Sequence, residues 1–323
     1  PLTEPENAGL PISTSYDLEH WTYRGVAVPV GTTGAWDDRA AWAPSVIESN
    51  GTWYLYYAGV HVQNGTLVQK IGLSTSTDGV NWTKYGENPV FDCGTLGWNY
   101  WNLSDTGNGA ACRDPFVIRD EEHNRWAMFY TAALPHIDQY PYWGLANPAV
   151  VGVAYSDDLV YWTDGGFIEA TRGAQAESPH IVSHNGTWYL IFTGNCSFLG
   201  TTKCLNYSTA SSLTGTYSGY SDLPSAEPHY FASDYYRINT GRELFGYVDS
   251  GTIRFADLDW SSGNLGFQAI PHNQIRGNVG RDENRYGRLD ENETVINGVK
   301  VAAYLDEGDG IFCTTADHFR TRY

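Results

Sequence analysis

The chain has 323 residues and a formal net charge of −18, from 37 acidic and 19 basic side chains. Nucleic acids and anionic membranes are bound mainly through Lys and Arg, so this charge argues against both as partners. Charged residues make up 17% of the chain, aromatic residues make up 15%, and Gly occurs 35 times. This composition excludes intrinsic disorder and favours short strands joined by turns over a helical bundle.

No stretch approaches the roughly 18 uncharged apolar residues that a membrane-spanning helix needs, so we expect no association with a membrane. The first residues, Pro1 to Glu4, do not have the character of a signal peptide. We therefore expect a mature chain from which such a segment has already been removed.

The first predicted element is a strand in residues 12–21, which ends in a Ser- and Asp-containing turn before a Trp. A longer pattern then recurs in residues 42–82, 113–162, 177–209 and, more weakly, 227–257. In each unit a short apolar strand follows a Pro, a Gly or Asn turn leads to an aromatic strand, and a third strand ends in a Ser/Asp turn. In the clearest units a Trp begins the fourth strand. Four antiparallel strands repeated at a spacing of roughly 50 to 70 residues are typical of a β-propeller blade.

The C-terminal part of the chain supplies predicted strands in residues 293–296, 299–304 and 310–317. With residues 12–21 they would complete one blade shared by both chain ends, which removes an open sheet edge. Residues 1–323 would then form a single five-bladed β-propeller of four-stranded antiparallel blades, its first blade completed by residues 285–323. The alternative is that the first strands of this blade are missing and that the C-terminal segment is an appendage.

The cysteines are typical of an oxidising compartment. Cys93 is close in sequence to Cys112, and Cys196 is close to Cys204, so each pair could form a local disulfide. Cys313 is left over, either as a buried thiol or as the partner of a cysteine outside this chain. No Cys/His spacing indicates a zinc site.

Eight N-glycosylation sequons, against about three expected by chance, also favour a secreted, extracellular glycoprotein with N-linked glycans. They lie at Asn50, Asn64, Asn81, Asn102, Asn185, Asn195, Asn206 and Asn292. The alternative for Asn50, Asn64 and Asn185 is that Asn-Gly-Thr is simply favourable turn sequence.

Acidic side chains occur at the start of three of the repeated units. Asp114, Glu177 and Glu227 each precede a Pro by one or two residues. One such acid would be a solvated turn residue, but acids at matching positions of several blades converge on one mouth of a propeller. Crowding and partial burial there raise the pKa of one carboxyl group and leave another ionised. Glycosidic cleavage needs such a pair, one to protonate the leaving oxygen and one to activate water or attack the sugar.

Three phrases resemble those of known five-bladed propeller glycosidases: Trp42-Ala-Pro-Ser-Val-Ile, Arg113-Asp-Pro-Phe-Val-Ile and Glu177-Ser-Pro-His-Ile. The similar proteins are the arabinanases, arabinofuranosidases and xylosidases of glycoside hydrolase family 43 and the related family 32 fructosidases. The resemblance covers roughly residues 12–260. It implies that Glu177 is the general acid and that Asp114 orients this acid and tunes its pKa.

The sequence departs from that family pattern at the catalytic base, which the resemblance places on an Asp of the first blade. Neither a first-blade Asp-Pro phrase nor the Trp-x-Asn-Asp-Pro motif of family 32 is present. If the C-terminal segment completes the first blade, Asp290 precedes its first strand and is the first choice. Asp38, with its neighbour Asp37, is the next choice. The alternative for Asp37 and Asp38 is a merely solvated loop near Trp36 and Arg39.

Several other residues are expected to contact a sugar at the mouth. Aromatic faces stack on sugar rings, Arg113 can pair with the acids, and two His residues follow a Pro in matching units. The predicted substrate-binding residues are Trp42, Arg113, His180, Glu227, His229 and Trp101. For both His residues, a purely structural role or a role in holding an ion is equally consistent. Trp82 and Trp162 belong to the repeated outer turn, so they are expected to pack between blades.

These features predict a secreted glycosidase that cleaves arabinose- or xylose-containing oligosaccharides or polysaccharides with paired carboxylates. One alternative is a retaining fructan or sucrose hydrolase of the family 32 type. Another is a sugar-binding propeller without catalysis, motivated by the missing base. No cofactor is required, no catalytic metal is expected, and a structural calcium ion on the propeller axis is conceivable.

Overall fold

The computed structural model describes the chain in fourteen segments. These are residues 9–15, 21–105, 109–135, 149–171, 175–195, 203–223, 231–237, 243–249, 252–260, 265–275, 279–280, 295–296, 302–305 and 321–322. Within them the fold consists of β-strands and two short 3-10 helices, η1 (Cys93–Thr95) and η2 (Glu169–Thr171). No helix in the described part of the chain is long and apolar enough to span a membrane.

Four sheets are antiparallel meanders of four consecutive strands. The first contains β3 (Ala40–Ser49), β4 (Thr52–Gln63), β5 (Thr66–Ser76) and β6 (Thr83–Lys84). The second contains β7 (Arg113–Asp120), β8 (Arg125–Ala133), β9 (Ala149–Ser156) and β10 (Thr163–Phe167). The third contains β11 (Glu177–His184), β12 (Thr187–Asn195), β13 (Lys203–Ala210) and β14 (Ser221–Asp222). The fourth contains β15 (Phe231–Arg237), β16 (Glu243–Asp249), β17 (Thr252–Asp259) and β18 (Gly266–Ile275).

A further four-stranded sheet joins strands from both ends of the chain. Its order is β2 (Thr22–Val28), β1 (Leu10–Ser15), β21 (Ala302–Leu305) and β22 (Thr321–Arg322). The pairing of β1 with β21 is parallel, whereas the predicted blades were antiparallel throughout.

The C-terminal strand predictions are only partly correct. The strand predicted at residues 299–304 overlaps β21. The one at residues 293–296 was wrongly placed in the first blade, because β20 (Val295–Ile296) pairs with β19 (Val279–Gly280) in a separate ladder. Residues 310–317 lie outside the described residues.

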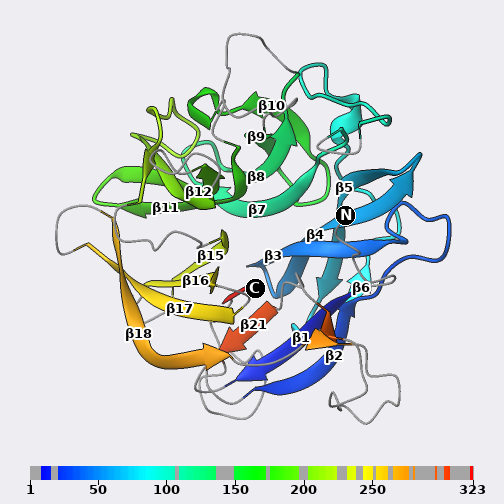
Figure 1. The fold of residues 1–323 in the computed structure, drawn as a ribbon, viewed down its shortest axis with the longest axis horizontal. Coiled ribbons are helices and arrows are strands. Elements are labelled where there is room, and N and C mark those ends of the chain that lie inside the picture. Colours follow the sequence, from blue (N-terminus) through cyan, green and yellow to red (C-terminus); the bar gives the residue numbers. More distant parts are fainter. Residues whose placement is uncertain are drawn as a thin grey trace.

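The sheets surround a central axis, with β3, β7, β11 and β15 facing it (Figure 1). Each of these inner strands contacts the next one along the chain, and β22 contacts both β3 and β15. The predicted all-β propeller is therefore confirmed.

The inner strands of three meanders begin with the same backbone irregularity. Two residues of the inner strand face one residue of its partner between Trp42 and Ser45, between Arg113 and Phe116, and between Glu177 and His180. Each irregularity is a β-bulge, since the inner strand advances three residues while its partner advances two. The bulges contain Ala43, Asp114 and Ser178, which all have positive φ (47°, 54° and 49°) and all precede a Pro.

The core lies between neighbouring sheets. Between the first two meanders, fully buried Tyr56, Leu73, Met128 and Tyr130 pack together. The half-buried Trp162 joins this cluster and meets Tyr56 edge to face at 5.5 Å between ring centroids. The expected blade-packing role of this outer-turn Trp is thereby confirmed.

The repeated Ser/Asp turn also forms as its sequence indicates. The carboxylate of Asp78 accepts hydrogen bonds from the main-chain N–H groups of Val80 and Asn81, and Trp82 donates to the Gly79 carbonyl. Asp158 caps the equivalent turn of the second meander in the same way. The turns therefore fix the outer edges of the blades through local bonds.

Candidate active site

Three charged side chains meet where β7 and β11 begin. Arg113 Nη2 donates a hydrogen bond to Glu177 Oε1 at 2.9 Å, and Arg113 Nε lies 3.8 Å from Asp114 Oδ2. The side chains of Arg113 and Asp114 are 13% and 10% exposed, whereas that of Glu177 is 31% exposed. The guanidinium thus joins two carboxylates from neighbouring sheets, and the Glu177 carboxylate is the one most open to solvent.

The Asp114 carboxylate is held by donors from two further strands. Its Oδ2 accepts from Thr131 Oγ1 at 3.1 Å, from the Ser178 N–H at 3.0 Å and from Ser178 Oγ at 3.3 Å. Thr131 lies on β8 and Ser178 on β11. The bond from Thr131 stays within the sheet of β7, whereas the bonds from Ser178 cross to the next sheet and fix Asp114 relative to the strand that carries Glu177.

The sequence predicts that the two acids occupy equivalent positions of the repeat, but in the structure they do not. Glu177 precedes its bulge and pairs with Thr193, which makes it equivalent to Arg113, paired with Thr131, and to Trp42. Asp114 is itself the bulge residue. The acids converge because the side chain of Asp114 reaches across to the next sheet.

The inner strand of the fourth meander, β15, also contains a bulge. The bulge of β15 lies between Phe231 and Asp234, so the strand positions of Glu177 and His180 are taken by Phe231 and Asp234. Glu227, His229 and Asp290 lie outside the described residues.

Asp37 and Asp38 have different environments, and neither is merely solvated. Asp37 is 3% exposed, and its Oδ2 is bound by Lys84 Nζ at 2.6 Å and by the Tyr57 hydroxyl at 3.0 Å. The solvated-loop interpretation is therefore wrong for Asp37, which belongs to a buried ion pair.

Asp38 has different partners from Asp37. Its carboxylate contacts His61 Nδ1 at 2.7 Å and accepts from the Gly34 N–H at 2.6 Å. Burial raises the pKa of Asp38, but the hydrogen bonds from His61 and from the Gly34 N–H outweigh this effect and lower it. Asp38 is therefore held in the ionised form that a catalytic base requires.

The predicted sugar-binding residues are distributed unevenly. Trp42 is half-buried at the strand position equivalent to Arg113 and Glu177, which agrees with a place at the mouth. His180 is 4% exposed, with ring centroids 5.7 Å from Phe116 and 6.1 Å from Phe245, so its environment is that of a core residue. Trp101 packs against Gly94 within its own loop and against the core cluster between the first two meanders.

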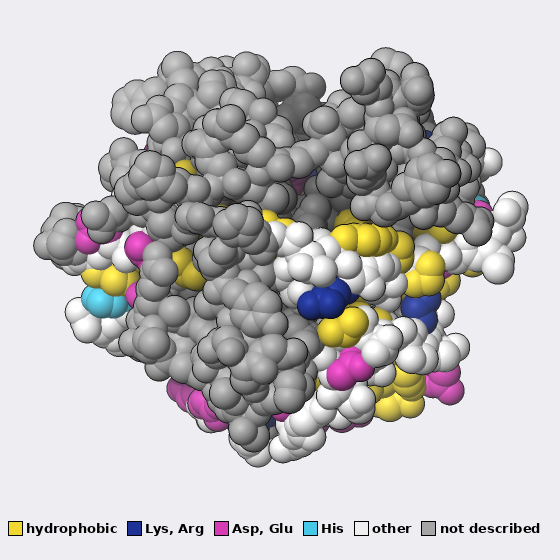
Figure 2. Space-filling model, turned by 90° about the horizontal axis from the view of Figure 1, so that it is seen from below, with side chains coloured by type: hydrophobic (Ala, Val, Ile, Leu, Met, Phe, Trp, Pro, Cys, Tyr) yellow, Lys and Arg dark blue, Asp and Glu magenta, His cyan; other side chains and the backbone are white. Residues whose placement is uncertain are grey.

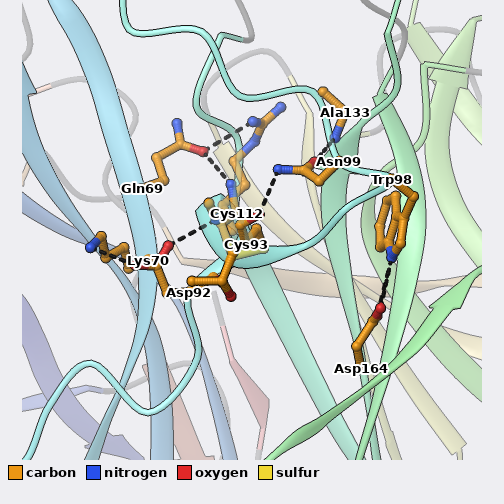
Figure 3. Close-up of a disulfide and its surroundings, with 12 residues drawn as sticks. Gln69, Lys70, Asp92, Cys93, Trp98, Asn99, Cys112, Ala133 and Asp164 are labelled. Carbon is orange, nitrogen blue, oxygen red and sulfur yellow. Dashed lines mark hydrogen bonds and ion pairs between the residues drawn. A yellow bond between two sulfur atoms is a disulfide. The ribbon is translucent and has the colours of Figure 1, made fainter.

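The predicted disulfide between Cys93 and Cys112 is present, with 5.7 Å between the Cα atoms, and it closes the loop that precedes Arg113 (Figure 3). Asn99 anchors this loop by donating to the Cys93 carbonyl and accepting from the Ala133 N–H. Cys204 is also disulfide-bonded. The predicted partner of Cys204, Cys196, and the remaining Cys313 lie outside the described residues.

Gln69 was missed by the sequence analysis. Its Oε1 accepts from Arg113 Nη1 at 3.2 Å and from the Cys112 N–H at 3.3 Å, and the residue is 6% exposed. Figure 3 shows its amide directed at the segment that contains Cys112. In the sequence Gln69 is one of several polar residues of β5, so no local signal distinguishes it.

Acidic side chains are also present on the outer surface of the molecule. Acidic side chains recur along the edge of the face shown in Figure 2, among apolar and uncharged ones. In the part of the chain that the structure describes, no group of three His, Cys, Asp or Glu side chains could hold a metal ion. The described residues therefore offer no such cluster to the calcium ion considered above.

Comparison with known proteins identifies relatives of the chain. A levanase from Bacillus sp. (strain L7) is 34% identical over 124 residues, which are 36% of this chain and 13% of the levanase. The extracellular endo-alpha-(1->5)-L-arabinanase 1 of Bacillus subtilis (strain 168) is 24% identical over 291 residues, which are 80% of each protein. A solved sucrose-6-phosphate hydrolase from Lactobacillus gasseri shares the fold, with a TM-score of 0.60 at 17% identity.

The lengths of these relatives differ from that of the chain. The similarity covers 79% of this chain but 53% of the sucrose-6-phosphate hydrolase, so the chain spans about half of that protein and a smaller part of the levanase. The family model described as glycosyl hydrolases family 43 matches residues 2–245. This match covers more than half of the chain, which therefore belongs to glycosyl hydrolases family 43.

Proposed function

We propose that the chain hydrolyses glycosidic bonds, with Glu177 as the general acid and Asp114 as the residue that orients it. The observation that carries this proposal is the position of Arg113, whose guanidinium joins the two carboxylates at the start of β7 and β11. In a glycosidase the acid must stand at a fixed place beside the leaving oxygen. The bonds from Thr131 and Ser178 to Asp114 supply such a fixed frame.

The chemical step assigns a different task to each side chain. The Glu177 carboxyl group gives its proton to the glycosidic oxygen, while a base removes a proton from the attacking water or attacks the sugar itself. Arg113 offers several N–H donors, which can bind sugar hydroxyls as well as the two carboxylates. Trp42, at the equivalent position of β3, supplies an aromatic face on which a sugar ring can stack.

The base is Asp290 or Asp38 in this proposal. Asp38 is supported by its lowered pKa and by its partial exposure of 16%. The distance from the base to Glu177 separates two mechanisms: carboxyl groups about 5–5.5 Å apart indicate retention, and about 6.5–9.5 Å indicates inversion.

We propose five blades for this propeller, the fifth being the sheet that contains β1, β2, β21 and β22. Support comes from the contacts of β22 with both β3 and β15. In this arrangement β21 and β22, from the C-terminal part of the chain, complete the blade that β1 and β2 begin. All five blades then belong to one domain.

The proposed substrates are arabinose- or xylose-containing oligosaccharides or polysaccharides, in line with the arabinanase relative. Fructans are the second candidate, favoured by the levanase match and by the Arg113-Asp114-Pro115 phrase. We also propose secretion, because the Cys93–Cys112 disulfide suits an oxidising compartment and the arabinanase relative is extracellular. A calcium ion on the axis stays a prediction, and the acid–base chemistry needs no cofactor.

The test is a digestion followed by proton NMR with arabino-, xylo- and fructo-oligosaccharides. Release of a sugar identifies the substrate class, and the anomer formed first distinguishes inversion from retention. Sugar binding without release, at high protein concentration, would contradict the catalytic proposal and favour a sugar-binding propeller.

A further inference from the structure

The Arg113 guanidinium contacts three sheet elements at once. It meets Glu177 on β11 and Asp114 on its own strand, and its Nη1 meets Gln69 of β5. The amide of Gln69 is almost fully buried, so its bond to the guanidinium is shielded from water. A buried hydrogen bond to a charged donor is stronger than an average one.

Gln69 is itself fixed by its surroundings. Its main-chain N–H donates to the Ala110 carbonyl at 3.1 Å, and its Oε1 also accepts from the Cys112 N–H. Two N–H donors therefore converge on one oxygen, and this determines the orientation of the amide. The disulfide at Cys112 ties the same segment to Cys93.

A neutral acceptor suits this position better than a charged one. A carboxylate beside Arg113 would compete with Glu177 and Asp114 for the guanidinium charge. An amide oxygen holds the guanidinium in place and leaves its charge to the two acids.

We infer that Gln69 is a positioning residue for the proposed active site, acting through Arg113 on the placement of Glu177. This inference rests on the proposed function for its kinetic consequence. The contact network of Gln69, Arg113 and Glu177 spans three consecutive sheets and stands independently of the reaction.

The test compares two substitutions of Gln69 with a control in the same loop. Gln69→Leu removes the acceptor at similar volume, and Gln69→Glu keeps an acceptor but adds a charge. Asn99→Ala loosens the same disulfide loop through its bonds to Cys93 and Ala133, without a contact to Arg113. Loop loosening alone would make Gln69→Leu and Asn99→Ala behave alike.

The first readout is the Nε–Hε NMR signal of Arg113, assigned by its loss in Arg113→Lys, and it requires no activity. We expect this signal to broaden in Gln69→Leu and to persist in Gln69→Glu and Asn99→Ala. An unchanged signal in a folded Gln69→Leu variant would overturn the inference. Equal broadening in Asn99→Ala would overturn it as well.

The second readout is kinetic, on whichever sugar the digestion identifies. Gln69→Leu should lower kcat by about tenfold or more with a smaller change in KM, and the double variant with Arg113→Lys should lose no more than Arg113→Lys alone. Gln69→Glu should fold normally and still lose kcat, because its charge competes with Glu177. Additive losses would overturn the inference. If the wild-type protein hydrolyses none of the sugars, the proposed function is contradicted but the positioning role of Gln69 is not. The NMR signal of Arg113 then tests that role without any activity.

Discussion

The Asp114 carboxylate accepts a hydrogen bond from the main-chain N–H of Ser178, which lies 64 residues further along the chain, at 3.0 Å. Both residues are the positive-φ members of their bulges, at 54° and 49°. The bulge of β11 therefore turns an N–H toward the neighbouring sheet and binds the acid of β7. Since Glu177 directly precedes Ser178, the same bond ties the proposed acid to Asp114.

Replacing Glu177 with Gln removes the proton that the proposed mechanism gives to the leaving oxygen. We expect kcat to fall by roughly 10²- to 10⁴-fold, because general acid catalysis contributes about this much, while sugar binding persists. Initial rates and calorimetric titration with the identified sugar measure both effects. Glu121→Gln, at a side chain that is 84% exposed, is the matched control and should be silent. Near-full activity of Glu177→Gln would remove Glu177 from the mechanism.

The backbone conformation of Ser178 is a second point at which the site can be tested. At a φ of 49°, Gly is unstrained, whereas a β-branched residue is strained by about 1–3 kcal/mol. Ser178→Gly keeps the N–H donor to Asp114 and should retain stability and most of the activity. Ser178→Val should lower both the free energy of unfolding and kcat. Urea denaturation of the two variants measures the difference in stability. Equal midpoints would show that the positive φ at residue 178 does not limit which side chain fits there.

The outer turn of the first meander predicts a pH dependence of stability. Burial raises the pKa of Asp78, but hydrogen bonds from the Asn81 side chain and from the main chain of Asn81 and Val80 lower it to about 2. A carboxylate with a lowered pKa in the folded state stabilises the protein above its unfolded-state pKa, near 4, and loses this contribution as the pH falls toward 2.

Asp78→Asn should therefore be less stable than the wild type by about 1–2 kcal/mol at neutral pH, with allowance for the partial exposure of the group. The difference between the two proteins should shrink between pH 4 and pH 2. Urea unfolding at several pH values measures it. A difference that stays constant over this range would show that the charge of Asp78 does not stabilise the fold.

The Pro-containing phrases predicted the inner strands β3, β7 and β11 correctly. In each of these strands the Pro directly follows the positive-φ residue of the bulge, so the Pro marks the same structural position. Aligning Pro44, Pro115 and Pro179 would also have revealed that Asp114 matches Ser178 rather than Glu177. The two acids were instead matched by charge, and this concealed the one-residue offset.

Other features had no signal in the sequence. Gln69 lies 44 residues before Arg113, and nothing in its neighbourhood indicates which side chain it contacts. The pairing of the buried Asp37 with Lys84 joins two residues that are 47 positions apart in the sequence. The repeat pattern predicted that the two ends of the chain share a blade, but it gave no sign that β1 and β21 pair in parallel. Such long-range contacts are set by packing, on which propensity and periodicity carry little information.

The sequons give the last prediction, because the structure separates those that a glycan can reach from those that it cannot. Asn50, Asn64, Asn81, Asn102 and Asn185 are exposed, whereas Asn195 and Asn206 are buried. Asn206 is fully buried, and its Nδ2 donates to Asp222 Oδ1 at 2.7 Å. A glycan on this nitrogen would need space that the packed core does not offer.

In the protein secreted from a eukaryotic host, we expect glycans on the exposed group and an unmodified Asn206. Enzymatic deglycosylation in ¹⁸O-water followed by peptide mass mapping measures the occupancy of each site. Asn185→Gln should remove one glycan without loss of stability, because the side chain lies in a surface turn. Asn206→Gln should change no glycan but should lower stability by about 1–3 kcal/mol, since it disturbs a buried hydrogen bond. A glycan on Asn206 in the folded protein would contradict the packing of β13 against β14.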